Sequence, residues 1–194
     1  MDEVLWATGR ISGVTALLLI TLSIVLGVVS RSGRSLTGTR GGGLSRVSLS
    51  LVHRNIALLS GLFVLLHIVT LLFDSFAQLS LANLVLPFLA AHDPFWQGLG
   101  TVAFDLLIAI VLTGLLRVRI GPAAFRLVHW LVYALWPLAL LHGLGNGTDG
   151  LSTWFLVLSA ASALAVLLAL IWRLSRTFTR TSHLASHLEE RTWA

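Results

Sequence analysis

The chain has 194 residues, of which 56% are hydrophobic and 11% charged, and its mean hydropathy is +0.90. This composition is too apolar for an ordinary soluble domain and is typical of an integral membrane protein. The absence of cysteine excludes disulfides, iron–sulfur clusters, thiolate zinc sites and thioether-attached haem, so any redox centre must be bound by histidine.

Five segments are long and apolar enough to cross a bilayer. In chain order they are residues 4–30, 49–73, 96–116, 125–144 and 151–173. The first is not a cleavable signal peptide, because acidic residues replace the basic ones that begin a signal and the apolar run is too long. We therefore expect an all-α integral membrane protein, with a single domain over residues 1–194 that forms a bundle of five transmembrane helices.

The connections between these segments differ in character. RSGRSLTGTRGGGLSR, after the first segment, is flexible by its glycine and serine content. Residues 74–95 form a longer loop whose apolar run LSLANLVLPFLA is too short to span, which predicts a re-entrant or interfacial lid. RVRIGPAAFR and GNGTDG are expected to be short turns, and residues 174–194 a cytoplasmic tail.

Arginine supplies all 13 positive residues, and its distribution predicts the orientation. All arginines except Arg10 fall on one side of the five-helix arrangement. Because positive charge stays on the cytoplasmic face, we expect the N-terminus outside and the C-terminus inside, in a plasma or inner membrane. The net charge of +5 then reflects topology and contact with anionic lipids, and not nucleic-acid binding.

Four histidines form two matched pairs on the second and fourth segments, which both run from cytoplasm to exterior. His53 and His67 are 14 residues apart, and His129 and His142 are 13 apart. At about 1.5 Å per residue these spacings correspond to roughly 20 Å, so His53 lies level with His129 and His67 with His142. Two helices with imidazoles at two shared depths can ligate two b-type haems stacked across the membrane.

A simpler interpretation exists for each histidine alone, namely a hydrogen bond to a neighbouring helix or a place at the interface. Two matched pairs are harder to explain in this way, because ionisable groups at membrane depth are costly and usually functional.

The 13-residue spacing does not suit an ideal helix, which would turn His142 about 140° away from His129. Pro137 lies between them and removes a backbone donor. We therefore predict a helix irregularity between Tyr133 and Leu141.

These residues resemble the ferric reductase-like transmembrane domain, a family that includes iron reductases, NADPH oxidases and the haem subunit of the periplasmic methionine sulfoxide reductase system. The resemblance covers most of residues 6–150. It is carried by TGRISGVTALLLITLSIVLGVVSR, HRNIALLSGLFVLLH, FWQGLGTVAFDLLIAIVLTGLLRVRIG and RLVHWLVYALWPLALLHGLGNGTD. It implies two haems, electron movement across the membrane, and an arginine, Arg10, facing the outer haem propionates or the site where the final acceptor is reduced.

Reductases and oxidases of this family usually continue into a flavin- and nicotinamide-binding domain, but this sequence has no G-x-G-x-x-G fingerprint opening a strand-helix unit. We therefore expect a stand-alone di-haem cytochrome b subunit of an oxidoreductase. It would take electrons from a separate flavoprotein or quinol, with flavin or quinone supplied by or shared with that partner, and pass them to an extracytoplasmic acceptor. Oligomers are possible.

Other side chains have two interpretations each. Arg10 could extend to the outer headgroups or pair with Asp105, which could also be a proton route or simply neutral. Arg31 and Arg54 belong to the arginines at the inner end, where haem propionates would emerge, and Arg54 is the better candidate for a propionate contact. Trp136, seven residues past His129, shares its helical face and could lie between the haems, although packing is the commoner role.

Three further features have weaker interpretations. His92 and Asp93 could meet a metal or an acceptor, or form a solvated loop. Gly9 and Gly13 form a GxxxG that permits close helix approach. His183 and His187, with Glu190, could bind zinc, but an amphipathic tail is the better interpretation.

Two other functions remain open. One is a quinol-linked cytochrome with a quinone site at its inner end, and the other is a non-catalytic haem- or metal-handling or assembly protein.

Overall fold

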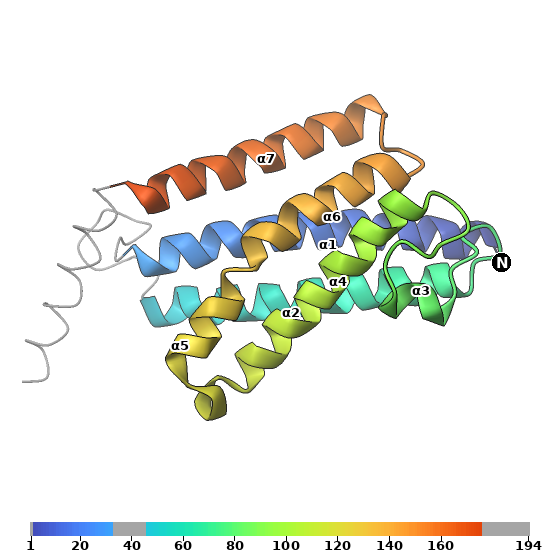
Figure 1. The fold of residues 1–194 in the computed structure, drawn as a ribbon. Coiled ribbons are helices and arrows are strands. Elements are labelled where there is room, and N and C mark those ends of the chain that lie inside the picture. Colours follow the sequence, from blue (N-terminus) through green and yellow to red (C-terminus); the bar gives the residue numbers. More distant parts are fainter. Residues whose placement is uncertain (1, 33–45, 176–194) are drawn as a thin grey trace, which may run out of the picture. The chain divides into compact units, whose positions relative to one another are not determined.

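The computed structural model describes residues 2–32 and 46–175, and all regular structure in these ranges is helical (Figure 1). The helices are α1 (Asp2–Arg31), α2 (Arg46–Leu72), α3 (Leu81–Val85), α4 (Pro94–Leu115), α5 (Arg117–His129), α6 (Val132–Asn146) and α7 (Thr153–Leu174). The all-α prediction is confirmed. The first, second, third and fifth predicted spans correspond to α1, α2, α4 and α7, with ends that differ by at most three residues.

The helices have the length and the surface of membrane spans. Within residues 2–32 and 46–175, four helices, α1, α2, α4 and α7, are long and apolar enough to cross a bilayer, and the bent pair α5 and α6 makes a fifth if counted as one span. Large apolar side chains remain exposed along them, among them Leu62 and Leu65 of α2 and Leu167 and Leu168 of α7. Lipid tails are as apolar as leucine, so this surface needs no protein cover in a bilayer. The chain is a multi-pass membrane protein.

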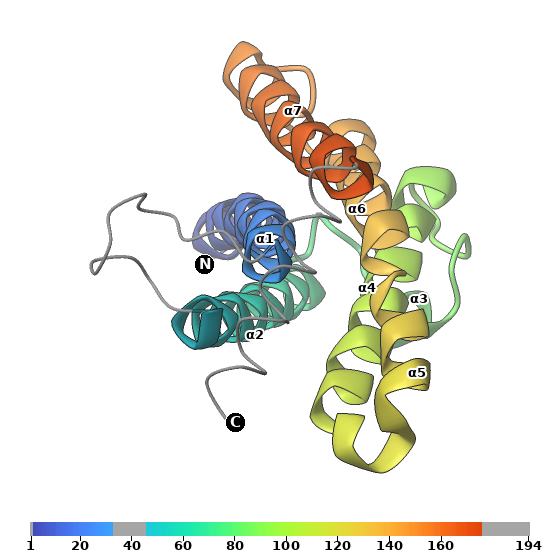
Figure 2. The ribbon, with the colours of Figure 1, turned by 90° about the vertical axis from the view of Figure 1, so that its left-hand side faces the viewer.

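The chain forms two compact units. The first comprises Met1–Leu18 and Leu58–Ser159, and the second comprises Leu19–Ala57 and Ala160–Ala194. In the first unit α4 and α6 pack side by side (Figure 2). Leu135 and Trp136 of α6 are buried. In the second unit Val28 of α1 and Leu49 of α2 are buried.

The span predicted over residues 125–144 is broken between α5 and α6. The two helices are bent by 47° at a break that contains Trp130 and Leu131. The turn there is wound more tightly than an α-helix, because the N–H groups of Leu131, Tyr133 and Ala134 donate to carbonyls three residues earlier.

The predicted position of this irregularity, between Tyr133 and Leu141, is wrong. Residues Val132–Asn146 are helical straight through Pro137. Pro137 has no N–H for the carbonyl of Tyr133, so the first turn of α6 lacks one bond. The axis changes direction just before that weakened turn, and not at the proline itself.

The segment RVRIGPAAFR is not the short turn that we predicted, because α5 covers it. Two helical pieces join at Gly121, whose φ of 79° and ψ of 164° lie in a region open only to glycine. Pro122 follows at the start of the second piece, where a missing N–H removes no helical bond. The chain therefore turns within helical structure and needs no separate loop.

The long connection between α2 and α4 contains the short helix α3, which is fixed to α4. Ser80 caps α3, and Asn83 completes a capping box with it. The Thr101 hydroxyl of α4 donates to the carbonyl of Asn83 over 2.7 Å, and the ring of Phe88 lies against Gly98. The loop thus has a defined place on the start of α4, while its role as a lid stays a prediction.

Candidate haem-binding site

Two of the four helix histidines lie close together in the first unit. His67 is on the C-terminal part of α2 and His142 on the C-terminal part of α6. Their ring centroids are 6.3 Å apart and their ring planes meet at 81°. The structure therefore brings together the two histidines that the sequence places at one depth.

The hydrogen bonds of these rings fix which nitrogen carries the proton. Nδ1 of His67 lies 2.7 Å from the carbonyl oxygen of Gly9, and Nδ1 of His142 lies 2.9 Å from that of Trp96. A carbonyl only accepts, so both Nδ1 atoms are donors. The neutral imidazole then carries its lone pair on Nε2, which is the form that binds a metal.

The spacing of the two rings matches that of two axial ligands of one haem iron. A metal–imidazole bond is about 2 Å long and the ring centre lies about 1 Å further, so two opposite ligands have centres about 6 Å apart. Among the described residues no group of three or more histidines, cysteines or acidic residues forms a metal site. A haem iron needs no such group, because the porphyrin supplies four nitrogens and the protein only two. The residues present fit a haem.

His53 lies in the second unit and has the same local arrangement. Its Nδ1 donates to the carbonyl of Ser23 on α1 over 2.8 Å, and the Ser23 hydroxyl oxygen lies 3.2 Å from the same nitrogen. The lone pair is again on Nε2. This histidine is therefore in the protonation state of a metal ligand.

His129 and Trp136 are separated by the break of the fourth span. His129 is the last residue of α5, and its ring centroid lies 5.2 Å from that of Phe125. Trp136 is buried within α6. Our prediction that the two share one helical face assumed a continuous helix from His129 to Trp136. That assumption is wrong, because the helix is interrupted between them, and seven residues return to one face only in an uninterrupted helix.

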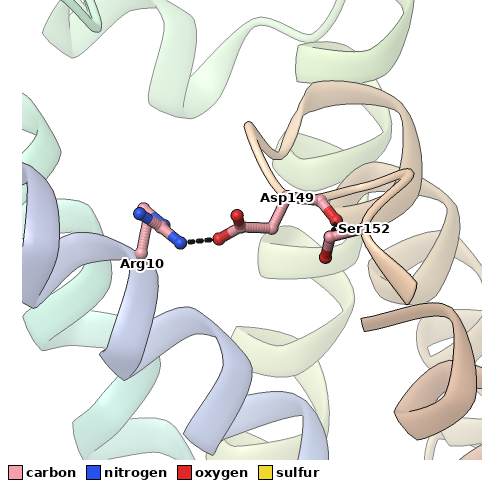
Figure 3. Close-up of polar contacts among 3 residues, drawn as sticks. All are labelled: Arg10, Asp149 and Ser152. Atoms are coloured by element: carbon pink, nitrogen blue, oxygen red, sulfur yellow. Dashed lines mark hydrogen bonds and ion pairs between the residues drawn. The ribbon is translucent and has the colours of Figure 1, made fainter. Parts of the chain in front are cut away.

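Arg10 on α1 forms an ion pair with Asp149, in the turn after α6 (Figure 3). The Asp149 carbonyl accepts a hydrogen bond of 2.7 Å from the Ser152 hydroxyl, which helps to hold this turn. The Arg10 guanidinium carbon also lies 4.1 Å from the ring centre of Trp6. Asp105, which we considered as the partner of Arg10, is exposed on α4. That pairing was wrong, since Asp149 reaches Arg10 instead.

The remaining candidates lie at the surface or outside the described residues. Arg31, in the last turn of α1, and Arg54, next to His53, are both exposed. His92 is exposed in the connection between α3 and α4. His183, His187 and Glu190 lie outside the described residues.

The fold and this site define a multi-pass helical membrane protein in which two helix histidines lie close together, each held by a backbone carbonyl. A comparison with protein families agrees, since residues 12–140, about two thirds of the chain, match the family described as ferric reductase like transmembrane component. The chain belongs to this family. No curated protein and no solved structure shows a significant match to it.

Sequence reasoning missed the groups that orient the imidazoles. They are backbone carbonyls of Gly9, Ser23 and Trp96, and a carbonyl has no side chain that a motif could reveal. It also missed Asp149 as the partner of Arg10. The signal was present, because Asp149 lies in GNGTDG, the connection that follows the fourth segment and that the predicted topology puts on the same side as Arg10.

Proposed function

We propose that the chain is a transmembrane electron-transfer subunit that holds two b-type haems. His67 and His142 would ligate the outer haem, and His53 and His129 the inner one. The observation that carries the proposal is the His67–His142 pair, with its 6.3 Å separation and both Nδ1 atoms occupied by carbonyls. A pair built only for packing has no need of two rings whose Nδ1 atoms are both bonded to carbonyls, the tautomer that presents the Nε2 lone pair to a metal.

The haem supplies one-electron iron chemistry when bound, and the protein positions and tunes it. The carbonyl bonds to Nδ1 hold each ring in one tautomer and increase the basicity of the ligating nitrogen. The apolar side chains of the helices keep water away from the metal, which affects its potential.

The inner pair rests on sequence position and on the state of His53. His53 precedes His67 on α2 by 14 residues, and His129 precedes His142 by 13. The Nδ1 bond of His53 to Ser23 is the same kind of bond that His67 and His142 make. One helix thus offers two similarly prepared imidazoles at two depths, which supports a second haem.

Arginines are the proposed partners of the haem propionates. Arg54 and Arg31 are exposed at the end of the helices that we assign to the cytoplasmic side, and their guanidinium groups suit carboxylates. Arg10 is proposed for the outer haem. Its Nε is buried without a hydrogen-bond partner in the described structure, so this donor is not used by the ion pair with Asp149.

We propose that electrons enter from a flavoprotein or a membrane quinol outside these 194 residues and leave to an extracytoplasmic acceptor. The direction follows the family resemblance. The proposed topology rests on the distribution of the arginines, which favours an N-terminus outside and a C-terminus in the cytoplasm.

Cysteine labelling tests this topology, and the natural chain offers a background free of cysteine. Ala91→Cys lies in the exposed outer loop and Arg119→Cys at the exposed start of α5. We expect a membrane-impermeant maleimide to label Ala91→Cys in intact cells and Arg119→Cys only after permeabilisation. The opposite pattern contradicts the proposed orientation.

Electron transfer across a sealed membrane tests the function. Proteoliposomes carrying the haem-loaded chain, with ferricyanide trapped inside and dithionite added outside, should lose the internal ferricyanide absorbance several-fold faster than empty liposomes. His53→Ala and His67→Ala should each reduce the rate to that of empty liposomes, because one of the two haems is missing. Reduction of both haems without any loss of internal ferricyanide would favour a non-catalytic haem-handling protein.

A further inference from the structure

Three of the helix histidines share an arrangement that the proposed haem ligation does not itself require. In each case a glycine on the neighbouring helix lies against the imidazole. The pairs are His67 with Gly13, His142 with Gly100 and His53 with Gly27. For each glycine, the three atoms nearest to an added Cβ all belong to the histidine ring.

In all three histidine–glycine pairs, the residue whose carbonyl accepts from Nδ1 precedes the glycine by the same number of residues. Gly9 precedes Gly13 by four residues, and Trp96 precedes Gly100 by four. Ser23 likewise precedes Gly27 by four. In an α-helix the carbonyl of residue i accepts from the N–H of residue i+4, so each glycine N–H is the regular partner of the carbonyl that the imidazole also uses.

Helix geometry explains why this position is a glycine. The Cα–Cβ bond leans towards the helix N-terminus, so a Cβ at i+4 lies beside the carbonyl of residue i. There it would stand 2.8 Å from Nδ1 of His67, 2.6 Å from Nδ1 of His142 and 3.1 Å from Cε1 of His53. Without a Cβ, the second lone pair of the carbonyl is open to an imidazole from the next helix.

We propose that Gly13, Gly100 and Gly27 are positioning residues that let each ligating histidine reach a helical carbonyl and thereby fix the direction of its Nε2. This inference rests on the proposed function, because it gives that orientation a purpose in haem ligation. The spacing supports it, since Gly13 and Gly27 are 14 residues apart on α1, as are His53 and His67 on α2.

Glycine-to-alanine variants test the proposal, with Gly61→Ala as the matched control. Gly61 lies on α2, the helix that carries His53 and His67, and an added Cβ there meets no atom within 4 Å. We expect Gly100→Ala and Gly13→Ala to lose the outer haem, or to shift the largest g value of its low-spin ferric EPR signal. Gly27→Ala should change only the inner haem. Its effect should be the smallest of the three, because an added Cβ would stand 3.1 Å from the His53 ring, further than in the other two pairs. Gly61→Ala should leave both haems unchanged.

A second experiment separates an effect on the imidazole from a general loss of folding, by comparing melting temperatures with and without His67. If the imidazole is the reason for the glycine, Gly13→Ala should lower the apparent melting temperature in the parent chain but not in a His67→Ala background. There alanine should be neutral or stabilising, because it is the better helix former. This comparison of melting temperatures does not depend on bound haem. If the unmutated chain binds no haem, the proposed function is overturned, but the role of the glycine is still tested.

Two results overturn the inference. One is unchanged haem content and unchanged EPR signals in both Gly13→Ala and Gly100→Ala. The other is an equal loss of stability from Gly13→Ala with and without His67, which would make the glycine a helix-packing residue.

Discussion

His67→Ala and His142→Ala are each expected to remove the same haem. Both imidazoles belong to one pair, 6.3 Å apart, and a haem that loses one of its two axial ligands in a lipid-facing bundle loses most of its affinity. Each variant should fall from about two haems per chain to about one. The measurement is a reduced spectrum with haem counted against protein.

The double variant separates a shared site from two independent ones. If the two histidines hold one haem, His67→Ala with His142→Ala should still retain about one haem per chain, on the inner pair. His92→Ala is the matched control, because His92 is an exposed histidine of the outer loop. If each single variant keeps about one haem but the double variant keeps none, the two histidines hold different haems and the pairing is contradicted.

Gly145→Ala is expected to destabilise the first unit strongly. The indole of Trp96 lies directly on Gly145, and the three atoms nearest to an added Cβ are all ring atoms. Overpacking of this kind costs about 1–3 kcal/mol of the free energy of unfolding. Because the Trp96 carbonyl also holds His142, we expect weaker haem binding as well.

Thermal unfolding in detergent measures this effect. A chain of this size should lose roughly 2–4 °C of melting temperature for each kcal/mol. Gly61→Ala again serves as the control and should be neutral or slightly stabilising. Equal melting temperatures for Gly145→Ala and Gly61→Ala would show that Trp96 can move aside without cost.

The apolar helices could be predicted from the sequence because hydropathy and length alone define a span. The α5–α6 break could not be placed, since Pro137 gives a cause of weakness but not the turn where the axis bends. Residues 117–126, which contain Gly121 and Pro122, were predicted to be a short turn. Both residues are compatible with a helix that restarts after one non-helical residue.

For the site, the sequence contained more than we used. The histidine spacing pointed to His67 and His142 as a pair, and the structure brings them together. The matching 14-residue spacing of Gly13 and Gly27 was equally visible, but glycine reads first as a helix-packing residue. The choice of Asp149 over Asp105 for Arg10 depends on which carboxylate the packing of the first unit brings near, and hydropathy does not encode that.

The central claim is that this membrane protein holds two haems on four histidines, and counting haem in the purified chain tests it most directly. Protein expressed with sufficient haem supply should show a b-type reduced spectrum after dithionite and about two haems per chain by extraction. Protein that is folded and monodisperse yet carries no haem would contradict the account.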